Sequence, residues 1–387
     1  MGARVAALCL LQVFFTLSWT VYVIFLPALA AQAGIAREAV LWILMLDQAI
    51  FAVMDWALGA RADRTAGHLR RLGLWIAGVT AISCVAFLAL PFTALAGSAT
   101  AFLALVIAWS ASSSVLRAPP LVLLARGADL SARPAIAGAF MFGIGIAGAV
   151  APFLALAMSG VDARLAFVVS SIAVVATTIA LVRMPAVQTA PIESRNAGAR
   201  PGAGLFLAAT LLLAAGFQIH FSLTSAPRYL QFAPPTQVPW LLPLFWVGFN
   251  VAIFPAMTGL RRVGALPTMA MGAALAAVAA IIAAQATALG PLVAAEAAAG
   301  AGWGLAMVGV LAAAMELGAT GREGSNAGAA FALFAVAVFG RIAIVALQFP
   351  VDAATRPALQ LFAVASWFAA AVLLALAARR HRATGSA

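Results

Sequence analysis

The chain has 387 residues, of which 65% are hydrophobic and 9% are charged, and its mean hydropathy is +1.09. A soluble domain carries about 25% charged residues, so this composition excludes a protein whose surface is mainly solvated by water. The net charge of +11 does not indicate nucleic-acid binding. All 22 basic residues are arginines, and most of them lie between apolar segments, which is the pattern of membrane topology.

Twelve apolar segments are each long enough to cross a hydrocarbon core as a helix. We therefore expect an all-α membrane protein with twelve transmembrane helices. The first segment follows Arg4 as a signal peptide would, but it exceeds the core of about 7–15 residues of such a peptide, so we interpret it as a retained helix. The expected spans are 5–30, 39–60, 72–95, 99–125, 134–158, 164–184, 203–227, 238–259, 266–289, 291–317, 326–349 and 356–378.

The arginines are distributed unevenly between the two sides of the expected membrane. Because the number of spans is even, both termini lie on one side, and the loops on that side carry 16 of the arginines against 4 on the other. Basic loops mark the cytoplasmic side. The sequence therefore predicts a multi-pass protein of the cell inner (plasma) membrane with cytoplasmic N- and C-termini.

A polar stretch rich in proline and glycine divides the spans into two sets of six. Such a composition is typical of a flexible linker, and we expect bundles at 1–184 and 203–387 joined by a cytoplasmic linker at 185–202. The loops at 59–67 and 259–264 carry related Gly/Arg patterns. This repetition favours two pseudo-symmetric six-helix bundles, the arrangement of one large transporter class.

A charged motif, Gly-x-x-x-Asp-Arg, closes the second span. With the twelve spans and the central linker, it makes the whole chain resemble the major facilitator superfamily, whose signature here reads Gly-x-x-x-Asp-Arg/Lys-x-Gly followed by basic residues. One glycine comes a residue late. The resemblance implies a transporter that works by alternating access, with an inner gate at this motif. The gate residues are Asp55, Gly59, Asp63 and Arg64, and Gly67, Arg70 and Arg71 follow them.

The resemblance also suggests a partner for the motif. In the family, the carboxylate corresponding to Asp63 meets the amino terminus of helix 11, whose dipole favours negative charge. Here that terminus is expected near Ser325 and Asn326, which are good capping residues. A glycine-rich run from Gly138 to Gly148, followed by Ala151-Pro152, is a partial match to the family's antiporter motif and hints at efflux by antiport.

Polar side chains recur on spans 1, 4 and 7, which in the family line the central cavity together with span 10. We expect the substrate path to include Gln12, Trp19, Arg117, Gln218 and His220. Two interpretations of Arg117 remain open, because Asp55 lies at a similar depth. The two side chains form a structural ion pair, or Arg117 faces the cavity and binds an anionic group.

Ionisable residues inside a membrane are functional candidates by default. Asp47 lies about 10 Å below the outer face by helix geometry and has no partner on its own helix except Gln48. A carboxyl group in such surroundings can bind and release a proton near neutral pH. We expect Asp47 to carry the coupling proton, with Glu296 as second candidate, unless Glu296 forms a structural pair with Arg341.

Other chemistries find no support in the sequence. It contains no nucleotide-binding Walker loop, no Gly-x-Ser-x-Gly elbow and no cysteine or histidine pattern typical of a metal site, so we expect neither an enzyme nor a cofactor. The expected function is proton-coupled transport of a small organic solute, anionic or amphipathic, by a monomer in contact with membrane lipid. The alternatives are a lipid or lysolipid flippase and a non-transporting receptor or assembly factor. Solute identity and the direction of transport do not follow from the sequence.

Overall fold

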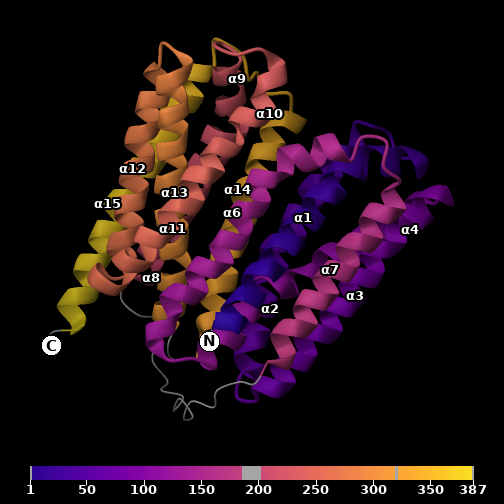
Figure 1. Cartoon of the computed structure of the whole chain (residues 1–387), viewed down its shortest axis with the longest axis horizontal. Coiled ribbons are helices and arrows are strands. Elements are labelled where there is room, and N and C mark those ends of the chain that lie inside the picture. Colours follow the sequence, from indigo (N-terminus) through magenta and orange to yellow (C-terminus); the bar gives the residue numbers. More distant parts are fainter. Residues whose placement is uncertain (1, 185–201, 319–320, 386–387) are drawn as a thin grey trace.

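The computed structural model describes residues 2–184, 202–318 and 321–385, and within these ranges it contains helices and no strand (Figure 1). Twelve helical segments in this part of the chain are long and apolar enough to cross a membrane, which confirms the predicted number. The chain is thus an all-α multi-pass membrane protein. The predicted linker, apart from Gly202, lies outside the described residues.

Six spans precede the linker position. The fourth of them is divided by the short 3₁₀ turn η1, and a second such turn, η2, precedes the fifth. The elements are α1 (Gly2–Gln32), α2 (Ala39–Thr65), α3 (Leu69–Leu95), α4 (Ala99–Ser113), η1 (Ser114–Leu116), α5 (Ala118–Arg126), η2 (Leu130–Ala132), α6 (Arg133–Ala157) and α7 (Ala163–Arg183).

Six further spans follow. The seventh contains a π-helical turn, η3, and the eighth begins with two short helical pieces. The elements are α8 (Ala203–Ile219), η3 (His220–Ser225), α9 (Ala226–Tyr229), η4 (Pro235–Gln237), α10 (Val238–Leu241), α11 (Pro243–Val263), α12 (Ala265–Gln285), α13 (Leu289–Leu317), α14 (Glu323–Ala346) and α15 (Arg356–Gly385).

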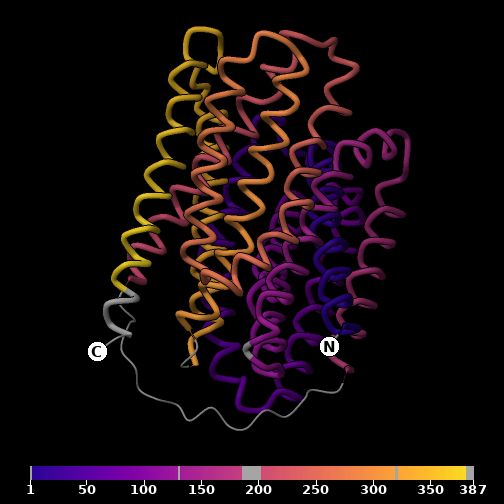
Figure 2. Tube along the Cα trace, turned by 60° about the vertical axis from the view of Figure 1, so that its left-hand side comes forward, coloured from indigo at the N-terminus to yellow at the C-terminus, as the bar shows by residue number. Residues whose placement is uncertain are grey.

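The spans stand side by side, and both termini lie at the same end of the molecule (Figures 1 and 2). We call this end the terminal end and the opposite one the far end. Helices remote in sequence pair across the two halves: α2 packs against α14, and α6 packs against α11. The two six-helix halves therefore meet along two helix pairs.

The fourth span, expected as one continuous helix, is broken at Arg117. Pro119 and Pro120 begin α5, and proline has no N–H to donate to a carbonyl one turn earlier. In a continuous helix the N–H of residue 120 would bond to Leu116. That carbonyl instead accepts a hydrogen bond of 2.9 Å from Gln12 Nε2 of α1. Gln12 thus supplies the hydrogen bond that the Leu116 carbonyl lacks at the break, next to Arg117.

The seventh span contains the π-helical turn η3. It precedes Pro227, which again removes one backbone donor. The Thr224 hydroxyl donates to the carbonyl oxygen of His220 over 2.8 Å, which stabilises the widened turn, and Ser225 Oγ lies 3.0 Å from the same oxygen. Such turns are rare and occur frequently at functional sites.

Three glycines let α2 and α14 approach closely near the terminal end. A Cβ atom added to Gly59 would overlap the carbonyl oxygen of Gly324, and one added to Gly328 would overlap the carbonyl oxygen of Asp55. Small residues at such interfaces allow backbones to touch inside a membrane. The tight contact at Gly59 therefore depends on the absence of side chains.

We predict opposite effects for two glycine-to-alanine substitutions. Alanine is favoured over glycine in a helix by about 1 kcal/mol, so Gly78→Ala in α3, where a Cβ meets nothing within 4 Å, should leave the melting temperature unchanged or raised. Gly59→Ala should lower it, because α2 must move away from α14. A Gly59→Ala protein as stable as Gly78→Ala in the same detergent would contradict the close contact.

Candidate substrate cavity and closed end

One cavity of about 280 Å³ lies between the two halves, and helices of both halves line it. Ten of its lining residues among those described are aromatic. The aromatic residues are Phe15, Trp19, Phe51, Phe140, Phe217, Trp246, Phe249, Trp303, Phe331 and Phe334. The polar ones are Gln12, Thr16, Gln48, Arg117 and Gln218. The wall is thus mainly aromatic, with one cation and several amide or hydroxyl groups.

Arg117 forms an ion pair with Asp55 and also lines the cavity, so both positions that the sequence left open are occupied by the same side chain. Its Nη1 lies 2.5 Å from Asp55 Oδ2, and the Asp55 side chain is fully buried. Its guanidinium also lies 4.0 Å from the centroid of the Phe51 ring, a cation–π contact. Because its side chain remains 19% exposed and lines the cavity, Arg117 can still donate to a bound anion.

Four of the five residues expected on the substrate path lie on this wall: Gln12, Trp19, Arg117 and Gln218. The Gln12 amide is only 1% exposed because it is held by the break in the fourth span.

His220 does not line the cavity, which corrects the expectation for this residue. Two residues along a helix turn the side chain by about 200°, so His220 faces away from the side on which Gln218 meets the cavity. It is buried behind the wall, with its ring 5.1 Å from that of Trp367.

Asp47 has two hydrogen-bond partners that its own helix could not reveal. Its partners come from other helices: Tyr22 of α1 donates to Oδ2 over 2.9 Å, and Ser110 of α4 donates to Oδ1 over 2.5 Å. The Asp47 side chain is fully buried. It lies one layer behind the cavity, since Tyr22 packs against Trp19 of the wall.

Glu296 pairs with the seventh span rather than with Arg341. Ser225 Oγ lies 3.1 and 3.0 Å from its two carboxylate oxygens, and His220 Nε2 lies 3.3 Å from Oε2, at ion-pair distance without hydrogen-bond alignment. The Nε atom of Arg341 has no hydrogen-bond partner among the described residues. The Glu296–Arg341 pair, which the sequence left open as an alternative, is therefore not found among the described residues.

At the terminal end, Asp63 joins the two halves. Its carboxylate accepts hydrogen bonds of 2.7 Å from the backbone N–H groups of Gly324 and Ser325 and from the Ser325 hydroxyl. These groups form the first turn of α14, where free N–H groups and the helix dipole favour an anion. The contact expected from the motif is present, whereas Arg64 beside it is exposed and has no partner among the described residues.

Three further charged residues extend this contact. Arg126 of α5 donates to Glu323 Oε2 over 2.9 Å and lies 3.7 Å from Asp63. Arg133 of α6 donates to the Met315 carbonyl over 3.0 Å and lies 3.9 Å from Glu323. Acids and bases thus alternate across the boundary between the halves. We refer to these contacts, together with those of Asp63, as the polar latch.

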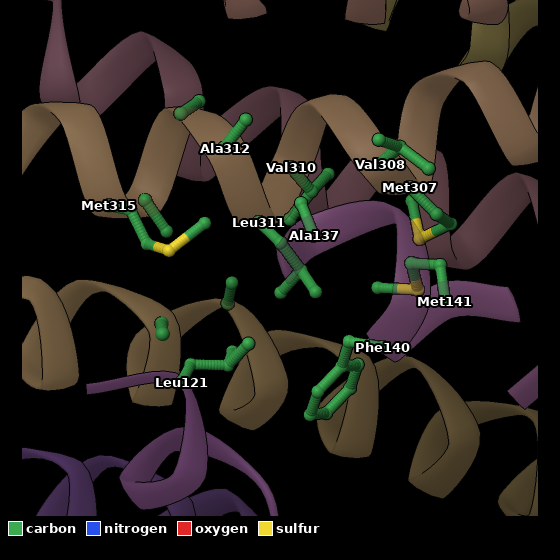
Figure 3. Close-up of a cluster of buried hydrophobic side chains, with 14 of the residues drawn as sticks. Leu121, Ala137, Phe140, Met141, Met307, Val308, Val310, Leu311, Ala312 and Met315 are labelled. Carbon is green, nitrogen blue, oxygen red and sulfur yellow. The ribbon is translucent and has the colours of Figure 1, made fainter. Parts of the chain in front are cut away.

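Apolar side chains from both halves form a buried cluster (Figure 3). It adjoins the central cavity, whose wall includes Phe140, Met141 and Met307, and the polar latch, where Arg133 donates to the Met315 carbonyl. Leu121, Ala137, Phe140 and Met141 come from α5 and α6 and meet residues of α13. All of these side chains are at most 3% exposed. We call this cluster the seal. The residues from α13 are Met307, Val308, Val310, Leu311, Ala312 and Met315.

Sequence reasoning missed the charged residues that surround Asp63 and most of the cavity wall. Arg126, Arg133 and Glu323 were visible only as loop charges, since nothing in the sequence showed that these loops meet. The aromatic residues of α11, α13 and α14 resemble core residues in sequence. The one usable signal was the position of Glu323 two residues before the expected cap at Ser325.

We predict that Asp63→Asn loosens the terminal end. An amide cannot supply the negative charge that the N-terminus of α14 favours, and Arg126 loses a neighbouring acid. The measurement is alkylation of Leu121→Cys, a seal position that is 1% exposed, in a chain with Cys9→Ser and Cys84→Ser. Labelling should rise severalfold with Asp63→Asn and stay unchanged with Arg64→Gln. Equal labelling in all three backgrounds would remove the gate role of Asp63.

No protein-family model and no curated protein matches the chain, but solved structures do. An outward-facing bacterial homologue of the iron transporter ferroportin is 13% identical, with a TM-score of 0.73 over 97% of this chain and 100% of the other. The E. coli fucose:proton symporter FucP is 14% identical, with a TM-score of 0.69 for one variant over 96% and 98% of the two chains. FucP in the outward conformation gives 0.67 over the same shares. This chain has the fold of the major facilitator superfamily transporters.

Proposed function

We propose that the protein is a secondary active transporter that moves a small organic solute by alternating access. The observation that carries this proposal is a cavity lined by both halves and closed at one end by contacts between those same halves. If the halves rock about the cavity, the polar latch opens and the solute reaches the other side. Transport proteins of this fold among the similar solved structures support this assignment.

The cavity wall suggests the class of solute. Aromatic rings on both sides favour a flat apolar body, and Arg117 with the amides of Gln48 and Gln218 favours a group that accepts hydrogen bonds. The volume of about 280 Å³ suits a small molecule rather than a lipid with two acyl chains. A small aromatic carboxylate or comparable amphipathic anion fits best, which makes the flippase the weaker alternative.

The arginine distribution supports an orientation with the terminal end in the cytoplasm of an inner-membrane protein. In that orientation the polar latch and the seal close the cytoplasmic side, and we infer that this conformation is the outward-facing one. The Asp55–Arg117 pair, Gly59 and Asp63 serve the closing of this side, with Arg126, Arg133 and Glu323.

We propose Glu296 as a proton-coupling site, because its ionisation decides which group receives the Ser225 hydroxyl proton. A serine hydroxyl has a single proton to donate, yet Ser225 Oγ lies within hydrogen-bond distance of both the Glu296 carboxylate and the His220 carbonyl. When Glu296 is ionised, the serine donates to it. When Glu296 is protonated, its own hydroxyl can donate to Ser225 Oγ. Ser225 then donates its proton to the His220 carbonyl in the π-helical turn instead. Protonation of Glu296 would therefore act on the bend of the seventh span.

Asp47 offers the corresponding site in the first half. Its ionised carboxylate holds α1 and α4 to α2 through Tyr22 and Ser110. Protonation would weaken both charge-assisted hydrogen bonds directly behind Trp19 of the cavity wall. We therefore propose both carboxylates as coupling sites, each acting on the helices that line the cavity.

A binding measurement tests the solute class. Because Trp19, Trp246 and Trp303 lie in the cavity wall, a bound solute should change tryptophan fluorescence. We predict that 2-naphthoate binds more tightly than its neutral amide, and that Arg117→Gln reduces this preference about tenfold, the effect of one charge-assisted hydrogen bond. The matched control is Arg61→Gln, an exposed arginine outside the cavity. No saturable response to any aromatic, sugar or amino-acid probe would contradict the proposal and favour a receptor or assembly factor.

A transport assay tests the coupling. In proteoliposomes, Glu296→Gln and Asp47→Asn should each abolish solute movement driven by a pH gradient, because the amides cannot take up a proton. Counterflow exchange without a gradient should remain within about twofold, since it needs no net proton transfer. Glu38→Gln, at an exposed position of the far end, is the matched control. Gradient-driven accumulation that persists in both amide variants would rule out both carboxylates as coupling sites.

A further inference from the structure

A second cavity lies outside the transport path, at the terminal end of the first half. It has a volume of about 510 Å³, larger than the central cavity, and is formed by α1, α3, α5 and α7. Helices α3 and α7 stand side by side here (Figure 1). Three of its lining residues are arginines: Arg4, Arg70 and Arg183. We call it the arginine cavity.

The arginines bring three positive charges to one cavity that no described carboxylate lines. Arg4 is only 7% exposed, and although its Nη1 donates to the Gly127 carbonyl over 3.2 Å, its Nε has no hydrogen-bond partner. Buried charges are normally paired, and a buried donor without an acceptor costs free energy. Arg4 is thus buried without a carboxylate partner among the described residues, whereas Arg70 and Arg183 are exposed at the mouth of the same cavity.

The helix that carries Arg70 adds to the positive potential. Arg70 lies in the first turn of α3, and His68 at the N-cap provides no side-chain cap. Free N–H groups and the dipole at a helix N-terminus favour an anion. Guanidinium groups bind phosphate well because their planar array of donors matches its oxygens.

Apolar side chains continue the cavity from the arginines into the membrane. Arg70, Leu74 and Ala77 recur at the spacing of one helix face on α3, and Ile179 lies one turn before Arg183 on α7. From Arg70 to Ala77 the cavity wall extends by about 10 Å along the helix. Leu74 is 64% exposed and so faces the lipid.

We propose that the arginine cavity binds the phosphate headgroup of an anionic phospholipid, with the upper part of an acyl chain against Leu74, Ala77 and Ile179. Phosphate is the chemistry that the three arginines recognise. A lipid is favoured over a free phosphate ion because the cavity is polar only at its membrane-surface end. The bound lipid would bridge α1, α3 and α7 of the first half.

Native mass spectrometry and thermal unfolding of the delipidated full-length protein test this proposal, with phosphatidylglycerol, phosphatidylethanolamine and inorganic phosphate as probes. Phosphatidylglycerol should be retained and should raise the melting temperature. The double variant Arg70→Gln/Arg183→Gln should weaken its retention at least tenfold. Arg64→Gln/Arg71→Gln is the control, because it removes the same charge from exposed residues that do not line the cavity.

A second variant separates the two sources of phosphate. Ala77→Trp fills the apolar part of the cavity and leaves the arginines intact, so it should reduce lipid retention more than phosphate binding. Three results would each overturn the proposal. They are an equal loss of lipid in both double variants, retention of phosphatidylethanolamine equal to that of phosphatidylglycerol, and full stabilisation by inorganic phosphate alone. The first would indicate diffuse charge attraction, and the last a site for a free anion.

Discussion

The closed terminal end depends on one electrostatic arrangement, a carboxylate of the first half placed at the amino terminus of a helix of the second. Asp63 accepts three hydrogen bonds from the first turn of α14, and Arg126, Glu323 and Arg133 continue the alternation of charge beside it. These bonds require α2 and α14 to approach closely, which is possible only because glycines line the contact between the two helices. This contact holds the two halves together at the terminal end, where the seal residues of both halves pack and close the cavity.

The same arrangement is suited to opening. The side chains of Asp63 and Arg126 are 8% and 16% exposed, so in this closed arrangement they are largely shielded from water. Water can replace their hydrogen bonds when the halves separate, so the polar latch need not be strong. A small difference in free energy between two arrangements is what lets a solute or a proton shift the population between them.

Each half contains one buried carboxylate that contacts polar groups on neighbouring spans. Asp47 holds the first and fourth spans through Tyr22 and Ser110, and Glu296 on the tenth span meets the seventh through Ser225 and His220. In each half a carboxylate thus connects the helices that line the cavity from behind. This parallel follows the expected repeat of six spans, in which spans 1 and 4 correspond to spans 7 and 10.

The sequence predicted the fold because bilayer thickness and loop charge constrain a membrane protein strongly. The resemblance to the superfamily implied that Asp63 meets a helix start of the second half, and capping residues located that start near Ser325. It failed where the answer depended on how spans pack. The donors to Asp47 lie on other helices. Gln12 donates to the Leu116 carbonyl at the break near Arg117, and this role could not be predicted because the break itself was not predicted. His220 was grouped with Gln218 although the two side chains point in nearly opposite directions.

Distances between spin labels test the central claim most directly. In a chain with Cys9→Ser and Cys84→Ser, one label pair on Arg64→Cys and Arg322→Cys reports on the terminal end, and another on Arg37→Cys and Asp352→Cys reports on the far end. All four positions are exposed. Alternating access predicts that solute or acid pH lengthens the first distance and shortens the second. Distances that stay fixed in both pairs, or that change together in the same direction, would contradict it.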